Sequence, residues 1–408
     1  MKTVRIIGMG VLGAALLGAA APPRDVWVGS WAASQQVPEP RNALPDPALA
    51  DATLRQVVRL STGGRRIRVL LSNAFGTEPL RIDAAHVARA GVGAALLPGT
   101  DRALTFDGAR DMLIPAGASY WSDPVTLDSP ALSSVTVSLH FPASPTVQPS
   151  HPGSRATSYI VSGNHVGDNM LSNPQTVEHW FQLAGVAVAA ATPAARAVVT
   201  LGDSITDGHG ATTNGNDRWP DLLAARLQAN PTTRAVGVLN HGIGGNRLLT
   251  DGLGPNVLAR FDRDVLAQPG VRYLVVLEGI NDLGTLTREA PVAPAEHEAL
   301  VARMIGTYRQ IIARAHAAGI KAYGATILPD GGSGYYHPDA RNEADRAAVN
   351  AWIRAPGHFD AVIDFDATMR DPVAPTKLRK AYDSGDGLHP SALGYNAMAQ
   401  SIPLALFR

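Results

Sequence analysis

The sequence contains no cysteine among its 408 residues. Disulfide bonds, thiolate metal sites and cysteine nucleophiles are therefore excluded. The chain also has no net charge, because 35 basic residues balance 35 acidic ones. A neutral chain gives no sign of the positive surface that binds nucleic acid or an anionic membrane. We therefore expect a neutral or weakly charged substrate and no nucleic-acid partner.

Long apolar runs are missing after residue 21, so we expect no integral membrane segment in the mature protein. The first residues differ from the rest. Lys2 and Arg5 precede an apolar stretch from Ile6 to Ala21 that ends in small residues. This pattern predicts a secretory signal peptide over residues 1–21 and a secreted or periplasmic protein.

Residues 25–190 are predicted to form an all-β domain. The segment Val135–Phe141 alternates apolar and polar residues, as a half-buried strand does. Leu54–Leu60 and Ile67–Leu71 flank a Thr-Gly-Gly turn, a pattern typical of a hairpin. Short strands separated by turn-rich stretches favour a β-sandwich of the jelly-roll kind. We find no catalytic constellation in this half, and its histidines lack metal-ligand spacing.

Residues 194–408 show a different pattern, in which apolar β-branched runs alternate with helical spacing. This alternation predicts a parallel sheet covered by helices on both faces, a flavodoxin-like three-layer α/β/α domain. A long helix is expected around residues 300–312, with Gly319 as its stop, and a closing helix over 392–406. The expected strands are Ala197–Leu201, Val236–Leu239, Tyr273–Leu277, Ile320–Leu328 and Val362–Phe365.

Three polar or glycine positions follow predicted strands, and all three should meet at one edge of the sheet. Ser204 follows the first strand and is the candidate nucleophile. The N–H groups of Ser204 and Gly245 and the side-chain amide of Asn281 can form an oxyanion hole. A serine needs a base whose tautomer is fixed by a carboxylate, and Asp386 and His389, three residues apart on a late turn, can supply both. Gly244 competes with Gly245, which we prefer from its spacing to the preceding strand.

The second half resembles the SGNH, or GDSL-type, hydrolase superfamily. The resemblance implies that Ser204 is the nucleophile, that Gly245 and Asn281 complete the oxyanion hole, and that no metal or organic cofactor is needed. It implies that Asp386 and His389 complete a triad. The first half resembles, more loosely, the β-rich N-terminal extension of some two-domain bacterial GDSL esterases. Four motif blocks carry the resemblance, in order: Gly202-Asp203-Ser204, the Gly245 segment, Gly279-Ile280-Asn281-Asp282 and Asp386-Gly387-Leu388-His389.

These observations predict a secreted serine esterase that works through an acyl-enzyme, with short-chain or acetyl esters of acylated carbohydrate as the leading substrates. A lipase, lysophospholipase or arylesterase is the alternative within the same chemistry. A carbohydrate-binding protein on a degenerate hydrolase fold is the alternative of another class, and the complete set of catalytic residue types argues against it. The sequence leaves the oligomeric state open. Candidate substrate-contacting residues are Trp219, His241, Tyr335 and Tyr336.

Overall fold

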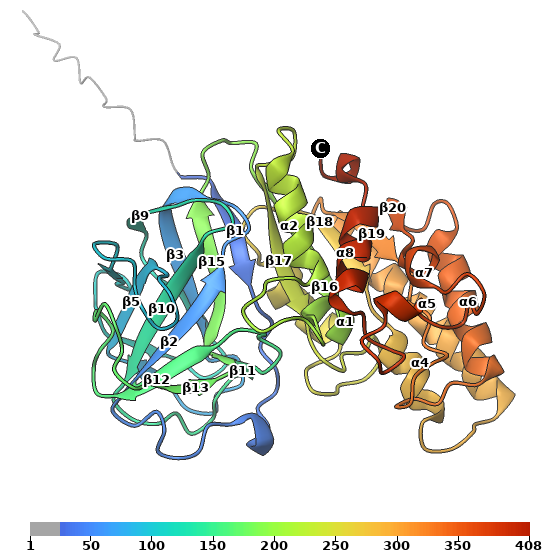
Figure 1. Cartoon of the computed structure of the whole chain (residues 1–408), viewed down its shortest axis with the longest axis horizontal. Helices are drawn as coiled ribbons and strands as arrows, with labels where there is room; N and C mark the ends of the chain where they lie inside the picture. The colour runs from blue at the N-terminus through green and yellow to red at the C-terminus, as the bar shows by residue number, and fades with distance from the viewer. Residues whose placement is uncertain (1–24) are drawn as a thin grey trace, which may run out of the picture.

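The computed structural model describes residues 25–408, and the predicted signal peptide lies outside these described residues. Two lobes stand side by side (Figure 1), the first built of strands and the second of a sheet flanked by helices. The last strand of the first lobe ends at Ala189, and the first strand of the second begins at Arg196. Residues 190–195 connect the two strands, and the domain boundary expected between residues 190 and 194 stays a prediction.

The first lobe consists mainly of two antiparallel sheets, which confirms the predicted all-β class. The side chains of Leu54, Ile67 and Leu139 are fully buried between them. One sheet contains β1 (Trp27–Ala32), β15 (Leu183–Ala189), β3 (Gly64–Ser72), β8 (Ser119–Trp121) and β9 (Val125–Ser129). The other contains β13 (Gln175–Val177), β12 (Ser158–Ser162), β2 (Ala52–Arg59), β10 (Ser134–Phe141), β5 (Ala84–Arg89) and β6 (Arg102–Ala103). Two short pairs complete the lobe: β4 (Leu80–Ile82) with β7 (Met112–Ile114), and β11 (Ser150–His151) with β14 (Trp180–Phe181).

The predicted hairpin of the first lobe is wrong. β2 pairs with β10 and β12, whereas β3 pairs with β15, β8 and β9 in the opposite sheet. The turn between them leads from one sheet to the other and is hydrogen-bonded to β1. Ser30 of β1 donates its hydroxyl to the carbonyl of Thr62 at 2.6 Å. The hydroxyl of Ser61 in turn donates to the carbonyl of Ser30 at 2.6 Å. A strand-turn-strand pattern does not say which strands its two strands will pair with.

The second lobe has a five-stranded parallel sheet in the order β17-β16-β18-β19-β20, which confirms the predicted fold class. Its strands are β16 (Arg196–Gly202), β17 (Val236–Gly242), β18 (Val271–Leu277), β19 (Lys321–Ala325) and β20 (Ala361–Ile363). Because the first strand lies between the second and the third, the strand order reverses beside β16. Ligands of open α/β sheets bind at such a switch point.

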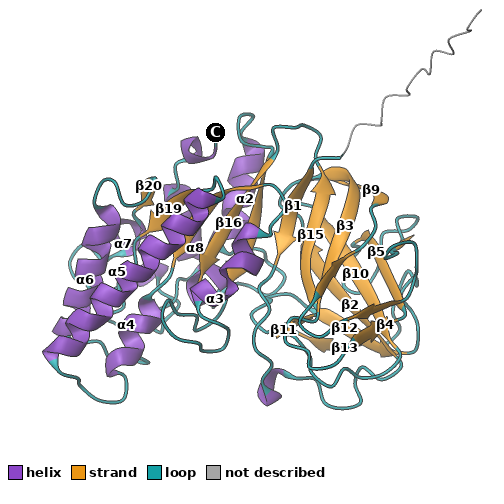
Figure 2. Cartoon of the chain, turned by 180° about the vertical axis from the view of Figure 1, so that it is seen from behind, coloured by secondary structure: helices purple, strands orange, loops and turns teal. Residues whose placement is uncertain are grey.

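Helices cover both faces of this sheet, with α2 and α8 together on one face and α3, α5 and α6 on the other (Figures 1 and 2). The α-helices are α1 (Ser204–Asp207), α2 (Trp219–Ala229), α3 (Val257–Phe261), α4 (Ile280–Thr287), α5 (Pro294–Ala317), α6 (Ala340–Arg354), α7 (Phe365–Met369) and α8 (Ala392–Ser401). The shorter helical turns are η1 (Pro40–Asn42), η2 (Asp262–Leu266), η3 (Lys380–Tyr382) and η4 (Leu404–Phe407). None of the helices in residues 25–408 is both long and apolar enough to cross a membrane.

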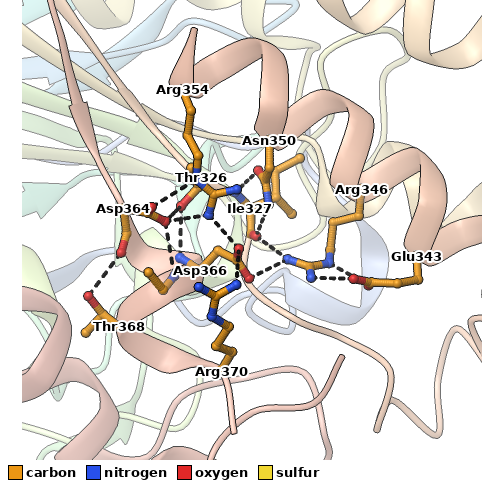
Figure 3. Close-up of polar contacts among 11 residues, drawn as sticks. Thr326, Ile327, Glu343, Arg346, Asn350, Arg354, Asp364, Asp366, Thr368 and Arg370 are labelled. Atoms are coloured by element: carbon orange, nitrogen blue, oxygen red, sulfur yellow. Dashed lines mark hydrogen bonds and ion pairs between the residues drawn. The ribbon is translucent and has the colours of Figure 1, made fainter. Parts of the chain in front are cut away.

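A buried ionic network fixes the chain after β19 (Figure 3). Asp366 of α7 accepts hydrogen bonds from Arg346 at 2.8 Å and from Arg354 at 2.6 Å, both in α6. Arg346 and Asn350 also donate to the carbonyl of Ile327, at 2.9 and 2.8 Å. The network therefore holds the start of the loop that carries residues 331–338 to the mouth of the sheet.

Candidate active site

Ser204 lies where β16 ends and α1 begins. Asp203 caps this short helix, because its Oδ1 accepts a hydrogen bond from the N–H of Ile205 at 2.9 Å. Gly208 closes the helix in a left-handed conformation and donates its N–H to the carbonyl of Ser204. The N–H of Ser204 belongs to the first turn, where backbone donors have no partner within the helix.

A chain of hydrogen bonds joins Ser204 to the late turn. Ser204 Oγ lies 2.8 Å from His389 Nε2, and His389 Nδ1 lies 2.6 Å from Asp386 Oδ2. The other carboxylate oxygen of Asp386 accepts the N–H groups of Leu388 and His389, at 2.9 and 2.8 Å. Because these bonds hold the carboxylate still, the ring is oriented with Nδ1–H toward Asp386 and Nε2 toward the serine hydroxyl.

The pKa values of His389 and Asp386 favour the protonation states that let His389 act as a general base. Burial lowers the pKa of His389, and the hydrogen bond to Asp386 offsets this only in part. Burial raises the pKa of Asp386, but hydrogen bonds from the backbone and ring of His389 and from the backbone of Leu388 outweigh it and bring that pKa to about 2. At neutral pH the pair is a neutral imidazole beside a carboxylate, the state from which a proton can be accepted.

A second histidine, His209, packs against the ring of His389. The ring of His209 lies against that of His389, with centroids 4.0 Å apart and planes tilted by 37°. Tyr395 donates its hydroxyl to the carbonyl of His209 at 2.7 Å. Burial lowers the pKa of His209, and the neighbouring His389 ring and Arg155 guanidinium lower it further, because each disfavours a second positive charge beside it. A neutral ring therefore packs against His389 and limits its movement.

Gly245 and Asn281 lie at the same edge as Ser204. Gly245 has a φ of +69°, a conformation that glycine adopts without a steric penalty. Asn281, in the first turn of α4, donates from Nδ2 to the carbonyl of Asn246 at 2.8 Å, and its Oδ1 accepts the hydroxyl of Tyr336 at 2.6 Å. With Oδ1 engaged by Tyr336, the second N–H of the amide remains for a substrate oxygen. Gly244 also lines the cleft, so the choice of Gly245 stays a prediction.

Asp282 holds the loop that carries Gly245. Its two carboxylate oxygens accept the N–H groups of Leu248 and Leu249, at 2.8 and 3.0 Å. Burial raises the pKa of Asp282 to about 6, although these hydrogen bonds act in the other direction. The carboxyl of one motif block thus fixes the backbone of another.

Arg260 joins four segments beneath the site and is fully buried. Its guanidinium donates to the carbonyls of Gly202 and His241, at 3.1 and 2.7 Å. It also donates to Asn246 Oδ1 at 2.7 Å and to Asp264 Oδ2 at 3.0 Å. One side chain therefore connects the ends of β16 and β17, the Gly245 loop and the turn after α3.

Besides Asp264, two further carboxyl groups lie buried near Arg260. Burial and the charges of Asp282 and Asp207 raise the pKa of Asp203 to about 7. Burial and the charge of Asp203 raise the pKa of Glu278 well above its usual value. The floor of the site therefore carries less negative charge at neutral pH than its number of carboxyl groups suggests.

The first lobe reaches the site directly. His151 lies between the lobes, with Nδ1 2.8 Å from the carbonyl of Ser34 and Nε2 2.8 Å from Asp207 Oδ1. Asp207 is in α1, three residues after the candidate nucleophile. Arg155 donates from Nε to the carbonyl of Gly208 at 3.1 Å. The first lobe therefore supports the helix that presents Ser204.

A cleft of about 960 Å³ opens over these residues. Tyr335, with 58 % of its surface exposed, and Tyr336, with 4 %, both line it, and their contact with substrate stays a prediction. Glu39 and Arg41 bring the first lobe to its rim. The remaining lining residues are Ser204, His209, Gly244, Gly245, Arg247, Gly252, Leu253, Asn281, Gly332, Gly334, Gly385, Asp386, Leu388 and His389.

Two predicted substrate contacts need correction, because neither Trp219 nor His241 lines the cleft. Trp219 is fully buried at the start of α2 and packs edge-on against Phe365 at 5.5 Å between centroids. His241 is buried at the lobe interface, with Nδ1 2.9 Å from Ser34 Oγ. Burial lowers the pKa of His241 to about 4, so it is a neutral polar link in that interface.

One group of side chains could hold a metal ion. The ligand atoms of His209, Asp386 and His389 lie within 4.8 Å of one another, and two imidazoles with a carboxylate suit a divalent transition metal. Both ring nitrogens of His389 already bond Ser204 and Asp386. A metal ion would therefore have to break the hydrogen-bonded chain to the serine.

The sequence did not indicate which residues position the side chains and backbone of the site. Tyr336 was expected to contact substrate, whereas it also orients Asn281. Arg260 and His151 gave no signal, because their partners lie far away in sequence. Asp282 had a usable signal, since it directly follows Asn281 at the start of a helix, but an ordinary turn was an equal alternative.

Comparison with known proteins gives three findings. The model of the GDSL-like Lipase/Acylhydrolase family matches residues 200–397. Among solved structures, the chain is similar to a GDSL-like lipase from Bacteroides thetaiotaomicron, with 20 % identity, a TM-score of 0.38, and 52 % of this chain and 87 % of that one covered. It is also similar to an acetylxylan esterase from Geobacillus stearothermophilus, with 19 % identity, a TM-score of 0.38, and 50 % and 91 % covered. A search of curated proteins found no match.

Proposed function

Residues 200–397 belong to the GDSL-like lipase/acylhydrolase family, and from this we propose that the protein is a serine esterase that cleaves carboxylic esters through an acyl-enzyme. The observation that carries the proposal is the hydrogen-bonded chain from Ser204 through His389 to Asp386, open to a cleft. A binding protein has no physical need for this arrangement, which argues against the non-catalytic alternative.

In the proposed reaction, Ser204 Oγ attacks the ester carbonyl while its proton passes to His389 Nε2. Asp386 holds the ring and stabilises the imidazolium that forms. The imidazolium then protonates the leaving alkoxide, which departs as an alcohol and leaves the acyl group on Ser204. Water, deprotonated by His389, releases the acid and restores the serine.

The carbonyl oxygen gains negative charge in both steps. The N–H groups of Ser204 and Gly245 and the side-chain amide of Asn281 would stabilise this charge by donating hydrogen bonds to the oxygen. Two sets of hydrogen bonds position these oxyanion donors. Tyr336 donates to Asn281, and Asp282 accepts two backbone N–H groups of the Gly245 loop. Their rigidity supports the proposal, because donors that are already oriented need no reorganisation during the reaction.

For the substrate we propose short acyl esters, acetyl esters foremost, of a carbohydrate. A volume of about 960 Å³ is far larger than an acetyl group needs and leaves room for a large alcohol. The cleft is lined by polar groups, glycines and the side chains of Leu253 and Leu388. The exposed ring of Tyr335 at the cleft suits stacking against a sugar. We further propose export to the periplasm or the outside, from the basic and apolar pattern of residues 1–21.

The test is hydrolysis of p-nitrophenyl acetate by the purified protein and by Ser204→Ala. We expect the variant to fold and to lose the activity. Ser133→Ala, which removes a hydroxyl bound only to a turn carbonyl of the first lobe, is the control and should behave as wild type. Activity that survives in Ser204→Ala would refute the proposed nucleophile.

A series of acyl chains separates the substrate classes. Acetyl, butyryl and octanoyl p-nitrophenyl esters should show decreasing kcat/KM if short acyl groups are preferred. Acetate release from acetylated xylan and pectin should then exceed release from a small aryl ester at equal ester concentration. A maximum at octanoyl would support the lipase or lysophospholipase alternative instead.

A further inference from the structure

One cation that lines the cleft forms no ion pair with the described residues. Arg247 lines the cleft two residues after Gly245. Arg41 also lines the cleft, but its Nε lies 2.9 Å from a carboxylate oxygen of Glu39. Within residues 25–408, Arg247 forms no ion pair at 4.0 Å or less, although its charge does lower the pKa of the nearby Asp282.

The donors of this guanidinium are little used. Nη1 donates to Thr250 Oγ1 at 3.2 Å. Nε is buried and has no hydrogen-bond partner among the described residues. A guanidinium carries five N–H donors in a planar fork, and a buried donor without a partner costs free energy. A ligand oxygen that reached this fork would remove that cost.

The backbone of Arg247 is held in place. Its carbonyl accepts the N–H of Val257 at 3.0 Å. The next two N–H groups, of Leu248 and Leu249, are bound by Asp282. The charged side chain therefore starts from a fixed point beside the proposed oxyanion hole, so that a bound anion would sit at a defined place relative to the ester.

We infer that Arg247 recognises a carboxylate on the substrate, so that the preferred esters carry an acidic group near the scissile bond. This inference rests on the proposed esterase function and narrows its substrate class. Arginine pairs with carboxylates through two parallel hydrogen bonds, which gives orientation as well as attraction. The carboxylate can belong to the alcohol, as in an acetylated uronic acid, or to the acyl group, as in a half-ester of a dicarboxylic acid.

Matched ester pairs test the inference and separate these two sources. For the alcohol side, acetylated glucuronic acid is compared with acetylated glucose. For the acyl side, mono-p-nitrophenyl succinate is compared with p-nitrophenyl butyrate. The readout is the ratio of kcat/KM for the charged ester to that for the neutral one. We expect the wild type to favour the charged ester in one of the pairs by about tenfold or more, as charge-assisted hydrogen bonds allow.

Arg247→Met keeps an unbranched apolar stem and removes the guanidinium fork, and we expect it to lower that ratio to about one. Arg247→Lys keeps the charge without the fork and should give an intermediate ratio. Arg81→Met, on an exposed part of β4 outside the cleft, removes the same charge elsewhere and should leave the ratio as in wild type. If Arg247→Met fails to fold, inhibition of the wild type and Arg247→Lys by glucuronate, with glucose as the control, takes its place.

The outcomes are distinguishable. If neutral esters are hydrolysed but neither pair shows a preference for charge, or if the preference survives in Arg247→Met, the role of Arg247 is refuted and the esterase proposal stands. In the inhibition assay, equal effects of glucuronate and glucose would also refute it. If the folded wild type hydrolyses no ester, the proposed function itself fails.

Discussion

Tyr336→Phe tests whether the oxyanion hole depends on a residue that never touches the reacting atoms. The substitution removes one hydroxyl from a ring that is 4 % exposed, so packing changes little. What it deletes is the 2.6 Å hydrogen bond that holds Asn281 Oδ1. Asn281 keeps its other bond, from Nδ2 to the carbonyl of Asn246.

The expected loss follows from these two bonds. A buried acceptor left without a donor costs about 1–3 kcal/mol. Loss of a complete oxyanion donor raises the barrier by about 3–4 kcal/mol. Because Asn281 Nδ2 keeps its hydrogen bond to the carbonyl of Asn246, we expect only part of this increase in the barrier. The predicted fall in kcat is about tenfold, which corresponds to about 1.4 kcal/mol. Asn281→Ala should lower kcat by about 10²- to 10³-fold.

The assay is kcat and KM on p-nitrophenyl acetate, with thermal unfolding of the same samples. KM should change little, because the hydroxyl faces Asn281. Tyr323→Phe is the matched control, since it also removes a buried hydroxyl, bound to the carbonyl of Leu406 at 2.5 Å in the C-terminal turn η4. It should lower stability and leave kcat as in wild type. Gly284→Ala should repeat the defect in kcat, because its new methyl group would collide with the ring of Tyr336.

Two results would refute this reasoning. If Tyr336→Phe lost stability to the same degree as Tyr323→Phe but kept its kcat, the hydroxyl would be structural only. If KM rose and kcat did not fall, Tyr336 would contact substrate rather than orient Asn281.

Three further predictions concern the base, the lobe interface and the ionic network. Because burial lowers the pKa of His389, the imidazole stays neutral in weak acid, and the acid limb of kcat/KM should have its midpoint below the usual histidine value of about 6.5; a midpoint above about 7 would contradict this. His151→Phe leaves the buried carboxylate of Asp207 without its partner and should lower both kcat and the unfolding temperature, and Asp207→Asn in the same chain should restore part of the stability; an unchanged kcat would show that the first lobe does not support α1. Asp366→Ala should lower the free energy of urea unfolding by about 1–3 kcal/mol, because Arg346 and Arg354 each lose one carboxylate partner. Both guanidinium groups keep a second carboxylate, that of Glu343 for Arg346 and that of Asp364 for Arg354, and an unchanged free energy of unfolding would count against the network.

Local patterns were enough for the class of each lobe. The period-2 alternation of Val135–Phe141 and the apolar runs before Ser204, Gly245 and Asn281 each depend on a few neighbouring residues. Such patterns state which residues face a core, and the carboxyl ends of parallel strands must then meet at one edge. The candidate nucleophile, base and oxyanion donors could therefore be placed together from sequence, although their catalytic roles stay predictions.

Local sequence patterns did not predict which strands pair or which candidate side chains are buried. β2 and β3 have the sequence of a hairpin, yet they lie in opposite sheets, and the turn between them is hydrogen-bonded to β1. Trp219 and His241 have residue types that suit a binding wall, yet one lies in the core of the second lobe and the other at the lobe interface.

By itself, the sequence determined the two fold classes, the order of the motif blocks and the residues that could carry acyl transfer. Only the tertiary structure decided that the first lobe supports α1, that Tyr336 orients Asn281, and that Arg247 lines the cleft without an ion pair among the described residues. The physical reason is the range of the contacts. Strand period and helix spacing are set by near neighbours, whereas His151 meets Asp207 across 56 positions and Tyr336 meets Asn281 across 55.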